Sequence, residues 1–490
     1  MKYTKGEKIN MDIMDLASSL IQKVTSNYGK KLQKNGVAPA IPVASPVEIA
    51  GDKFNMGFAR EEIMPDLTLT DRTYYIAGHG SGHVMDGVIS PVYVHAVWID
   101  CGSGEGIIWL SGDVVGLTNI EVKEIRKRIY ASKKIHGCRA VNFSSTHSHS
   151  GIDTVGYWGK ANLVSIPSNG KVPEYMEMLF TKAVEAAEQA YLNREPGKLY
   201  NGRITVPGGL FTKRKFADRH EVLTRLRFVP DSGNNETWIM NFGGHPNSLG
   251  GANRKLSGEY PYFMREQIKE ESGADVLFCI GAIGGMDCAE YDGSDEPLDR
   301  VKYQAKLLAD AVKTIENETE MEPRMKFLRQ QFYLPVDNNV LTLLATLGTM
   351  SFRGYPCKTS ATGICMKTEL TYMTIGTQKF LLLPGENFVC TVYGGYMDAE
   401  HSTTGLAPDI NPAPLCEIAG DSELIAVGVT NDMTGYVVPP NDFVLNPTQP
   451  YLNGTKDRFG DNHYHETNSM GPETQQTIAD TFAMMVKNFG

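Results

Sequence analysis

Short apolar runs rich in β-branched and aromatic residues recur along the chain from Phe54 onward, and segments of helical periodicity lie between them. This alternation predicts an α/β fold with a mixed β-sheet core layered with helices, in which the strands are buried between helices. The expected strands are Val92–Ile99, Ile107–Leu110, Ala140–Ser144, Trp238–Phe242, Asp275–Ile280, Phe380–Leu383 and Leu424–Val429. The expected helices are roughly Ile120–Tyr130, Pro173–Leu192, Tyr260–Glu270 and Asp299–Ile315.

The charge balance narrows the classes of partner. The 490 residues include 47 Lys and Arg against 57 Asp and Glu, a formal net charge of −10, and no long basic run. This balance argues against binding to nucleic acid or to an anionic membrane surface. No segment approaches the roughly 18 consecutive apolar residues of a membrane span. We expect a cytoplasmic protein that acts on a small-molecule substrate, and the sequence is compatible with a homo-oligomer.

Residues 1–50 differ from the rest of the chain. Apolar residues recur at helical spacing over 11–33, and three prolines between positions 39 and 46 then exclude regular structure. We expect 1–50 to form a helical extension and a proline-containing linker that pack on the main body or on a partner subunit. Residues 51–490 are expected to form the main domain.

The segment 144–151, which reads SSTHSHSG, follows an expected strand and is the most informative about chemistry. Side chains two residues apart on a strand share a face, so His147 and His149 can point into one cavity. Two neighbouring imidazoles suit a metal ion, because one or both can bind it and the second can instead transfer a proton. A pair of hydrogen-bonded histidines at a strand end is the alternative interpretation.

Three further expected strands end in glycine and a polar residue. His245 follows Gly-Gly, Glu386 follows Pro-Gly, and Tyr436 closes the run that begins at Gly428. A glutamate buried directly after three leucines is costly unless it is paired or metal-bound. With His147, these residues would form a zinc site with room for water. Taken singly, each has a structural alternative: a rim histidine, a salt-bridged glutamate, a core tyrosine.

Other polar residues carry weaker signals. His79 and His83 lie in a glycine-rich loop that could line a pocket or simply cover the surface. This loop lacks the Gly-Lys-Ser/Thr ending of a nucleotide-binding loop. Asp113 follows another expected strand, where it could orient an imidazole or cap a turn.

Together these motifs resemble the catalytic domain of the neutral and alkaline (non-lysosomal) ceramidases, from Gly57 almost to the C-terminal end. The segment Thr146–Gly151 is similar to the family's THTHSG, and His245–Leu249 is similar to the segment that supplies a second histidine ligand in bacterial members. Pro384–Glu386 and Asn431–Tyr436 match the remaining ligand motifs in the same order. The resemblance implies a ceramidase-like metallohydrolase domain over 51–490.

The resemblance also implies an activity, the hydrolysis of an N-acyl amide. Zinc would lower the pKa of water toward ~7 and polarise the acyl carbonyl. His149 would act as a hydrogen-bonding or proton-transfer group, and we expect it to protonate the leaving amine. Arg214 occupies the place of a family arginine that fixes the substrate or the polar network beside the metal. The implied ligands of one Zn²⁺ are His147, His245, Glu386 and Tyr436.

Departures from the family change the expected substrate. The family's GDxSPN-like segment carries a catalytic serine, whereas the matching stretch here is Gly281–Cys288, with Asp287 in place of the serine. Asp287 is expected to act as a base, to contact a substrate amine or to cap the loop. We also expect the chain to lack the immunoglobulin-like domain, the secretion signal and the membrane-binding face of ceramidases. These departures favour a small soluble substrate over a long-chain lipid. The residues expected to shape its pocket are His79, His83, Tyr157 and Trp158.

The leading hypothesis is therefore a zinc-dependent hydrolase that cleaves an amide-type C–N bond of an N-acyl compound or lactam by metal-activated water. An esterase or lactonase is the close alternative, because the same attack cleaves carboxylic esters. A non-catalytic, metal-dependent binding protein is the alternative from another class.

Overall fold

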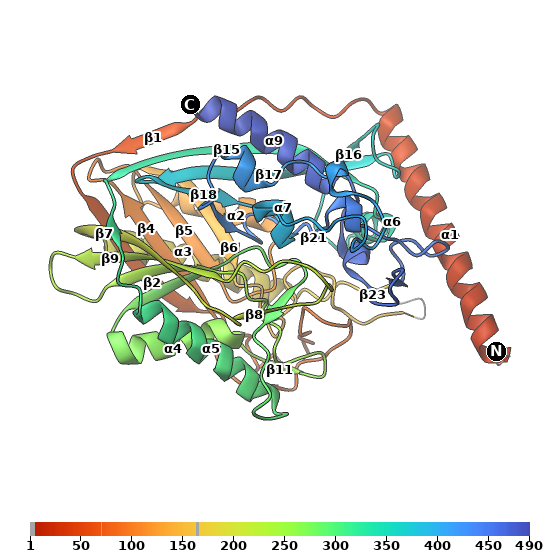
Figure 1. Cartoon of the computed structure of the whole chain (residues 1–490), viewed down its shortest axis with the longest axis horizontal. Coiled ribbons are helices and arrows are strands. Elements are labelled where there is room, and N and C mark those ends of the chain that lie inside the picture. Colours follow the sequence, from red (N-terminus) through yellow and green to blue (C-terminus); the bar gives the residue numbers. More distant parts are fainter. Residues whose placement is uncertain (1–4, 70, 163–165) are drawn as a thin grey trace.

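Two β-sheets pack face to face, and helices cover the outer face of each (Figure 1). The computed structural model describes residues 5–69, 71–162 and 166–490, with side chains from Ile13 onward, so residues 1–4 of the expected extension lie outside it. The expected α/β class with mixed sheets is confirmed. The layering differs in one respect, because each sheet has helices on one face and the other sheet on the opposite face.

The larger sheet is mixed and curls on itself. Its strands are β2 (Phe54–Glu62), β4 (Tyr93–Asp100), β5 (Gly106–Gly112), β6 (Cys138–Ser145), β7 (Glu195–Thr205), β9 (Val222–Pro230), β10 (Thr237–Phe242), β12 (Asp275–Ile280) and β14 (Thr319–Glu320). The order is β12-β10-β9-β7-β2-β4-β5-β6, with β14 on β7 and parallel pairs at both ends, β10/β12 and β5/β6. A hydrogen bond of 2.5 Å from Ser111 Oγ to the Phe278 carbonyl joins β5 to β12, so opposite ends of the sheet meet.

The smaller sheet includes part of the amino-terminal segment. Its strands are β1 (Val47–Ala50), β15 (Arg324–Val336), β16 (Gly354–Pro356), β17 (Ile364–Ile375), β18 (Gln378–Leu382) and β20 (Ile425–Val427). The order is β1-β15-β17-β18-β20, with β16 on β17, and only β18/β20 is parallel among these described pairs. The end of the expected 1–50 extension is thus an edge strand of this sheet.

Alternating side chains of the two sheets form one apolar layer between them. In β4, Val97 and Ile99 belong to this layer, whereas Trp98 packs against the helices. Met373 and Ile375 of β17 meet the layer from the other sheet. Because both faces of such a strand are buried, the strand is apolar at nearly every position, which is the signal visible in the sequence.

The helices cover the two outer faces of the sandwich (Figure 1). They are α1 (Lys5–Lys34), α2 (Asn119–Ala131), α3 (Pro173–Leu192), α4 (Glu259–Ser272), α5 (Pro297–Lys313), α6 (Asn339–Thr346), α7 (Val389–Tyr393), α8 (Leu415–Ile418) and α9 (Thr474–Phe489). Helices α2, α3, α4 and α5 coincide with the four expected helices and pack on the larger sheet, while α9 packs on the smaller one. None of the helices in the described ranges has the length and apolar character needed to cross a membrane.

Helix α1 packs on the body through a small-residue face. Ser18, Ile21 and Thr25 are buried where α1 meets α6 and β16. The larger apolar residues Leu16 and Leu20 are 71% and 59% exposed. The apolar spacing therefore marks the helix correctly, but its most apolar stripe does not face the body.

Short two-stranded sheets order the loops around the sandwich. They pair β3 (Gly87–Val88) with β11 (Lys255–Leu256), β8 (Leu210–Thr212) with β13 (Met286–Cys288), β19 (Glu386–Asn387) with β21 (Tyr436–Val437), and β22 (Thr455–Lys456) with β23 (Asn462–His463). In the parallel pair β19/β21, Glu386 stands opposite Tyr436. Two of the four predicted metal ligands are thus held side by side by backbone pairing.

The layer between the sheets yields a stability prediction. Leu277 of β12 is fully buried in that layer. We expect Leu277→Ala to lower the free energy of unfolding by about 2–5 kcal/mol, because it removes apolar contacts and leaves a cavity. Leu192, at the end of α3, is 54% exposed, and Leu192→Ala should change the free energy of unfolding by less than about 0.5 kcal/mol. Denaturant unfolding measures both, and equal losses would contradict the packing described here.

Candidate metal centre

Strand ends from both sheets meet at one place, where the candidate site lies. The backbone N–H of Asn431, after β20, donates to the Phe143 carbonyl of β6 at 2.8 Å. The N–H of Gly428 donates to the Ile280 carbonyl of β12 at 3.0 Å. The loops that follow β6, β10, β18 and β20 are therefore brought to a common centre, which explains why the polar strand ends seen in the sequence converge.

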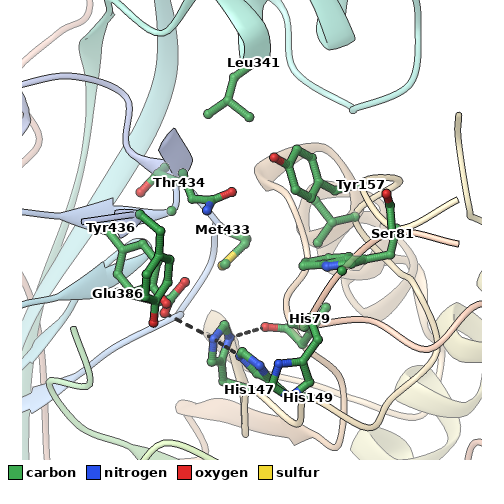
Figure 2. A pocket seen from close by; sticks show the side chains of 18 of the residues that line it. His79, Ser81, His147, His149, Tyr157, Leu341, Glu386, Met433, Thr434 and Tyr436 are labelled. Atoms are coloured by element: carbon green, nitrogen blue, oxygen red, sulfur yellow. Dashed lines mark hydrogen bonds and ion pairs between the residues drawn. The ribbon is translucent and has the colours of Figure 1, made fainter. Parts of the chain in front are cut away.

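Three histidines, His147, His149 and His245, gather at this centre, and Figure 2 shows the first two of them. The His149 Nε2 atom is 3.1 Å from His147 Nε2 and 2.8 Å from His245 Nε2. The backbone N–H of His149 donates to the Pro246 carbonyl at 2.9 Å, which joins the two histidine loops. His147 has a left-handed backbone (φ 62°), a conformation that costs a non-glycine residue energy and occurs where the surroundings impose it.

The ring protons of two of these histidines point away from the centre. His147 Nδ1 lies 2.6 Å from the Val115 carbonyl, and the His245 ring donates to the Ile283 carbonyl. A carbonyl only accepts, so in each ring the proton is on the nitrogen that faces the carbonyl, and Nε2 keeps its lone pair. Burial lowers the pKa of His245 well below its usual value, which keeps that imidazole neutral.

Glu386 completes the centre with a carboxylate. Its Oε2 atom is buried and has no hydrogen-bond partner among the described residues, and it lies 3.3 Å from His147 Nε2 and 3.8 Å from His245 Nε2. Burial and the charge of Glu386 raise the pKa of Tyr436, whose hydroxyl contacts that carboxylate. A buried carboxylate oxygen that faces imidazole lone pairs is unfavourable on its own and is satisfied by a cation. Nitrogen and oxygen donors of this kind fit a zinc-type ion.

The structure thus brings together all four predicted ligands and places His149 among them. The donor nitrogens of His147, His149 and His245 lie within 4.8 Å of one another, and all three residues are buried. These histidines form a group that can hold a metal ion.

Glu259 connects both histidine loops from the amino end of α4. Its Oε1 atom accepts hydrogen bonds from Ser150 Oγ at 3.0 Å and from the Leu249 N–H at 3.3 Å. The side chain is fully buried, Oε2 has no hydrogen-bond partner, and burial raises the pKa of Glu259 to about 7. The loops after His149 and after His245 therefore share one buried carboxyl group. No local sequence pattern indicates this role of Glu259.

Asp113 supports the same loop from the other side. Its carboxylate accepts hydrogen bonds from Arg265 at 2.6 Å, from the Tyr93 N–H at 3.0 Å and from Thr146 Oγ1 at 3.4 Å. Of its two expected roles, orienting an imidazole is not the one seen, because no histidine ring among the described residues hydrogen-bonds its carboxylate. Asp113 instead anchors Thr146, directly before His147.

A cavity of about 390 Å³ opens beside the histidines (Figure 2). We call it the metal cavity, after the candidate site at its wall. His147, His149, Glu386 and Tyr436 line it, whereas the described lining residues do not include His245. Its apolar walls are Val115, Val155, Trp158, Pro167, Leu341, Met350, Met433 and Met470. The expected pocket residues His79, Tyr157 and Trp158 line this cavity, and the described lining residues do not include His83.

The structure places Arg214 in a buried ion-pair network and not at the cavity wall. Arg214 pairs with Asp442 and with Glu466, the latter at 2.9 Å, and its guanidinium lies 4.9 Å from the Phe388 ring centre. Its neighbour Lys213 lines the cavity instead. Both residues lie in a bend directly after β8, outside regular structure, and their side chains enter different surroundings.

Asp287 lies next to the metal cavity but does not line it. Its Oδ1 atom accepts a hydrogen bond from Asn247 Nδ2 at 2.6 Å and forms an ion pair with Lys213 at 3.0 Å. It lines a second cavity of about 580 Å³, which shares His79, Lys213 and Asn247 with the first. Asp287 is therefore outside the group of proposed ligands, and its expected roles as a base, as a contact for a substrate amine or as a cap of the loop stay predictions.

Lys213 and Tyr464 are cavity residues that sequence reasoning missed. Lys213 sits in a short basic run in which it cannot be told from its neighbours, and Tyr464 lies in a segment without strand or helix signals. The two side chains are hydrogen-bonded to each other. Only their position in the folded chain identifies them.

The chain has the fold of the neutral ceramidases. The neutral ceramidase from Pseudomonas aeruginosa is similar to 89% of this chain over 75% of its own, with a TM-score of 0.65 and 15% sequence identity. A structure described as ceramidase complexed with C2 gives a TM-score of 0.62 at 14% identity, over 89% of this chain and 76% of that one. No protein-family model and no curated protein sequence matches the chain. The resemblance drawn from four short motifs is thus confirmed at the level of fold.

The buried carboxyl group of Glu259 yields a prediction of pH dependence. Its folded-state pKa of about 7 exceeds its ordinary value of 4.5, so between these values the folded protein binds a proton that the unfolded chain releases. Stability contributed by Glu259 therefore falls as pH rises through this window. We expect Glu259→Gln to remove this loss, so that its stability relative to the wild type increases from about pH 5 to about pH 8.

Denaturant unfolding at both pH values tests this expectation. The matched control is Glu316→Gln, a change at an exposed glutamate, which should show no such trend. A constant difference between the wild type and Glu259→Gln at both pH values would refute the role given to burial.

Proposed function

We propose that this protein is a zinc-dependent hydrolase that cleaves the amide-type C–N bond of a small soluble N-acyl compound or lactam. The observation that carries the proposal is the orphaned Glu386 carboxylate oxygen, which faces the imidazole lone pairs of His147 and His245 at the wall of a cavity. The resemblance to ceramidases, a family that hydrolyses N-acyl amides, supports the reaction class. The substrate expectation follows from the departures seen in the sequence.

In this proposal His147, His245, Glu386 and Tyr436 hold one Zn²⁺ per chain. Bound zinc supplies a Lewis acid that polarises the acyl carbonyl and lowers the pKa of water. The hydrogen bonds of the His147 and His245 rings to backbone carbonyls fix each ring with its lone pair toward the centre. The ligand geometry is therefore set before the metal binds.

His149 is assigned the transfer of a proton to the leaving amine nitrogen. It lines the cavity, whereas His245 does not, and its Nδ1 atom is buried without a hydrogen-bond partner. The His79 ring lies edge-on to it at 4.9 Å and restricts its orientation. Burial lowers the pKa of His149 and keeps the ring neutral, so it can take a proton from the attacking water and pass it to the amine, which leaves poorly without one.

The cavity supports a small substrate. Its volume of about 390 Å³ is near the lower end of the roughly 300–1,000 Å³ typical of small-molecule sites. Apolar side chains such as Trp158, Leu341 and Met433 form most of its wall, so an acyl group can be buried there and water excluded.

Metal content tests the ligand assignment. Purified wild-type protein should retain one zinc per chain after dialysis. His147→Ala and Glu386→Ala should lose most of the zinc, because each removes one of the four proposed donors. His83→Ala is the control, since His83 is not among the described residues of the cavity wall. Elemental analysis gives the stoichiometry, and full occupancy in either ligand variant would refute the assignment.

Activity separates the role of His149 from that of a ligand. We expect His149→Ala to keep zinc and to lose hydrolysis of simple N-acyl amides and lactams by about 10²–10⁴-fold, the usual contribution of a general acid. Hydrolysis of a nitrophenyl ester, whose leaving group needs no proton, should fall less. Loss of zinc in this variant would instead make His149 a third histidine ligand.

The same substrate panel tests the proposal as a whole. It contains N-acyl amides, lactams, lactones and simple esters, assayed with the zinc-loaded wild type. Turnover of lactones or esters without turnover of any amide or lactam would favour the esterase alternative. Bound zinc without turnover of any of these compounds would contradict an enzymatic function.

A further inference from the structure

Lys213 brings a positive charge to the metal cavity. Of the described residues that line this cavity, it is the only lysine or arginine. Its ammonium lies 3.0 Å from Asp287 Oδ1 and also hydrogen-bonds the Tyr464 hydroxyl, and 27% of the side chain is exposed. Burial opposes the charge, but Tyr464 and Asp287 raise the pKa of Lys213, so the group stays protonated.

The two cavities that meet at Lys213 differ in character. The metal cavity has mainly apolar walls, as described above. The second cavity is lined by charged side chains, among them Asp287, Glu290, Asp292 and Arg300. An amide substrate has an acyl half and an amine half, so the apolar cavity suits the acyl half and the polar side suits the amine half.

The ammonium of Lys213 has two hydrogen-bond partners among the described residues and so retains a free donor. An ammonium group has three N–H donors, and Asp287 and Tyr464 account for two of them. The Asp287 carboxylate is less available to bind a substrate group. Its Oδ1 atom already accepts from both Lys213 and Asn247, and the residue is not among those that line the metal cavity. The charge presented beside the metal centre is therefore positive, and it suits an anionic group on the substrate.

We propose that Lys213 binds a carboxylate on the amine half of the substrate, which makes N-acyl amino acids the substrate class. This inference rests on the hydrolase function proposed above. A carboxylate on the carbon next to the amide nitrogen would lie at the junction of the two cavities while the acyl chain fills the apolar one. Lys213 is thus a specificity residue, which contacts substrate away from the reacting bond.

Three compounds with the same acyl chain test this assignment: N-hexanoylglycine, N-hexanoylglycinamide and N-hexanoylethylenediamine, which are anionic, neutral and cationic in the amine half. Release of hexanoate by the zinc-loaded protein is measured for each. We expect kcat/KM to be about tenfold higher for the anionic compound than for the neutral one, with the difference mainly in KM, because the contact is made equally in ground and transition states.

Variants assign the preference to one side chain. Lys213→Met should abolish the preference for the anionic compound, Lys213→Arg should retain most of it, and Asp287→Asn should leave the order of the three compounds unchanged. The matched control is Lys215→Met, two residues along the chain, where the exposed side chain lies 5.2 Å from the Phe216 ring centre. This control should behave as the wild type.

Two results would overturn the inference while the hydrolase function stands. One is equal kcat/KM for the three compounds, and the other is a preference for the cationic compound that Asp287→Asn removes. If the zinc-loaded protein turns over none of them, the proposed function fails for this class, and calorimetric binding of N-hexanoylglycine decides the inference. Tighter binding to the wild type than to Lys213→Met then supports a carboxylate site, and equal binding refutes it.

Discussion

The structure depends on one local constraint: at the centre of the site, hydrogen-bond acceptors face one another. They are the imidazole lone pairs of two histidines and a buried carboxylate. His147 and His245 direct their ring protons to backbone carbonyls, and Glu386 leaves one oxygen without a hydrogen bond. Neutral donors cannot satisfy this arrangement from within, because each group is an acceptor toward the centre. A cation would satisfy all of them at once, and this is the physical argument for the proposed metal site.

Much of the fold serves to hold these acceptors together. The curled larger sheet and the loops of the smaller sheet bring strand ends from distant parts of the chain to one point. The left-handed backbone of His147 and the buried carboxyl of Glu259 are both costly locally, and both lie at the histidine loops. The apolar layer packed between the sheets supplies stabilising free energy that offsets these local costs.

The surroundings of the centre are asymmetric, and this asymmetry would orient the acyl and amine halves of the proposed substrate. An apolar wall lies on one side and a polar cavity on the other, with Lys213 and Asn247 between them. The size of the cavity and the charge at its edge support the proposed substrate, which is smaller and more polar than a long-chain lipid.

The sequence could predict those features that depend on local patterns. Buried strands read as apolar runs, so β4, β5, β6, β10 and β12 were foreseen close to their observed bounds. The long strands β7, β9, β15 and β17 were not, because polar or charged residues interrupt them and no continuous apolar run marks them. The placing of polar residues directly after strands likewise pointed to the four proposed ligands, since a strand end fixes where the next side chains emerge.

What the sequence determined by itself was therefore the set of elements and the polar residues at their ends. Only the tertiary structure decided which neighbour, Lys213 or Arg214, reaches the cavity, and that Asp287 lies in the adjoining one. It also decided that Glu259 joins the two histidine loops. The physical reason is that the direction and environment of a side chain outside regular elements are set by segments far away in the sequence, whose packing no local pattern records.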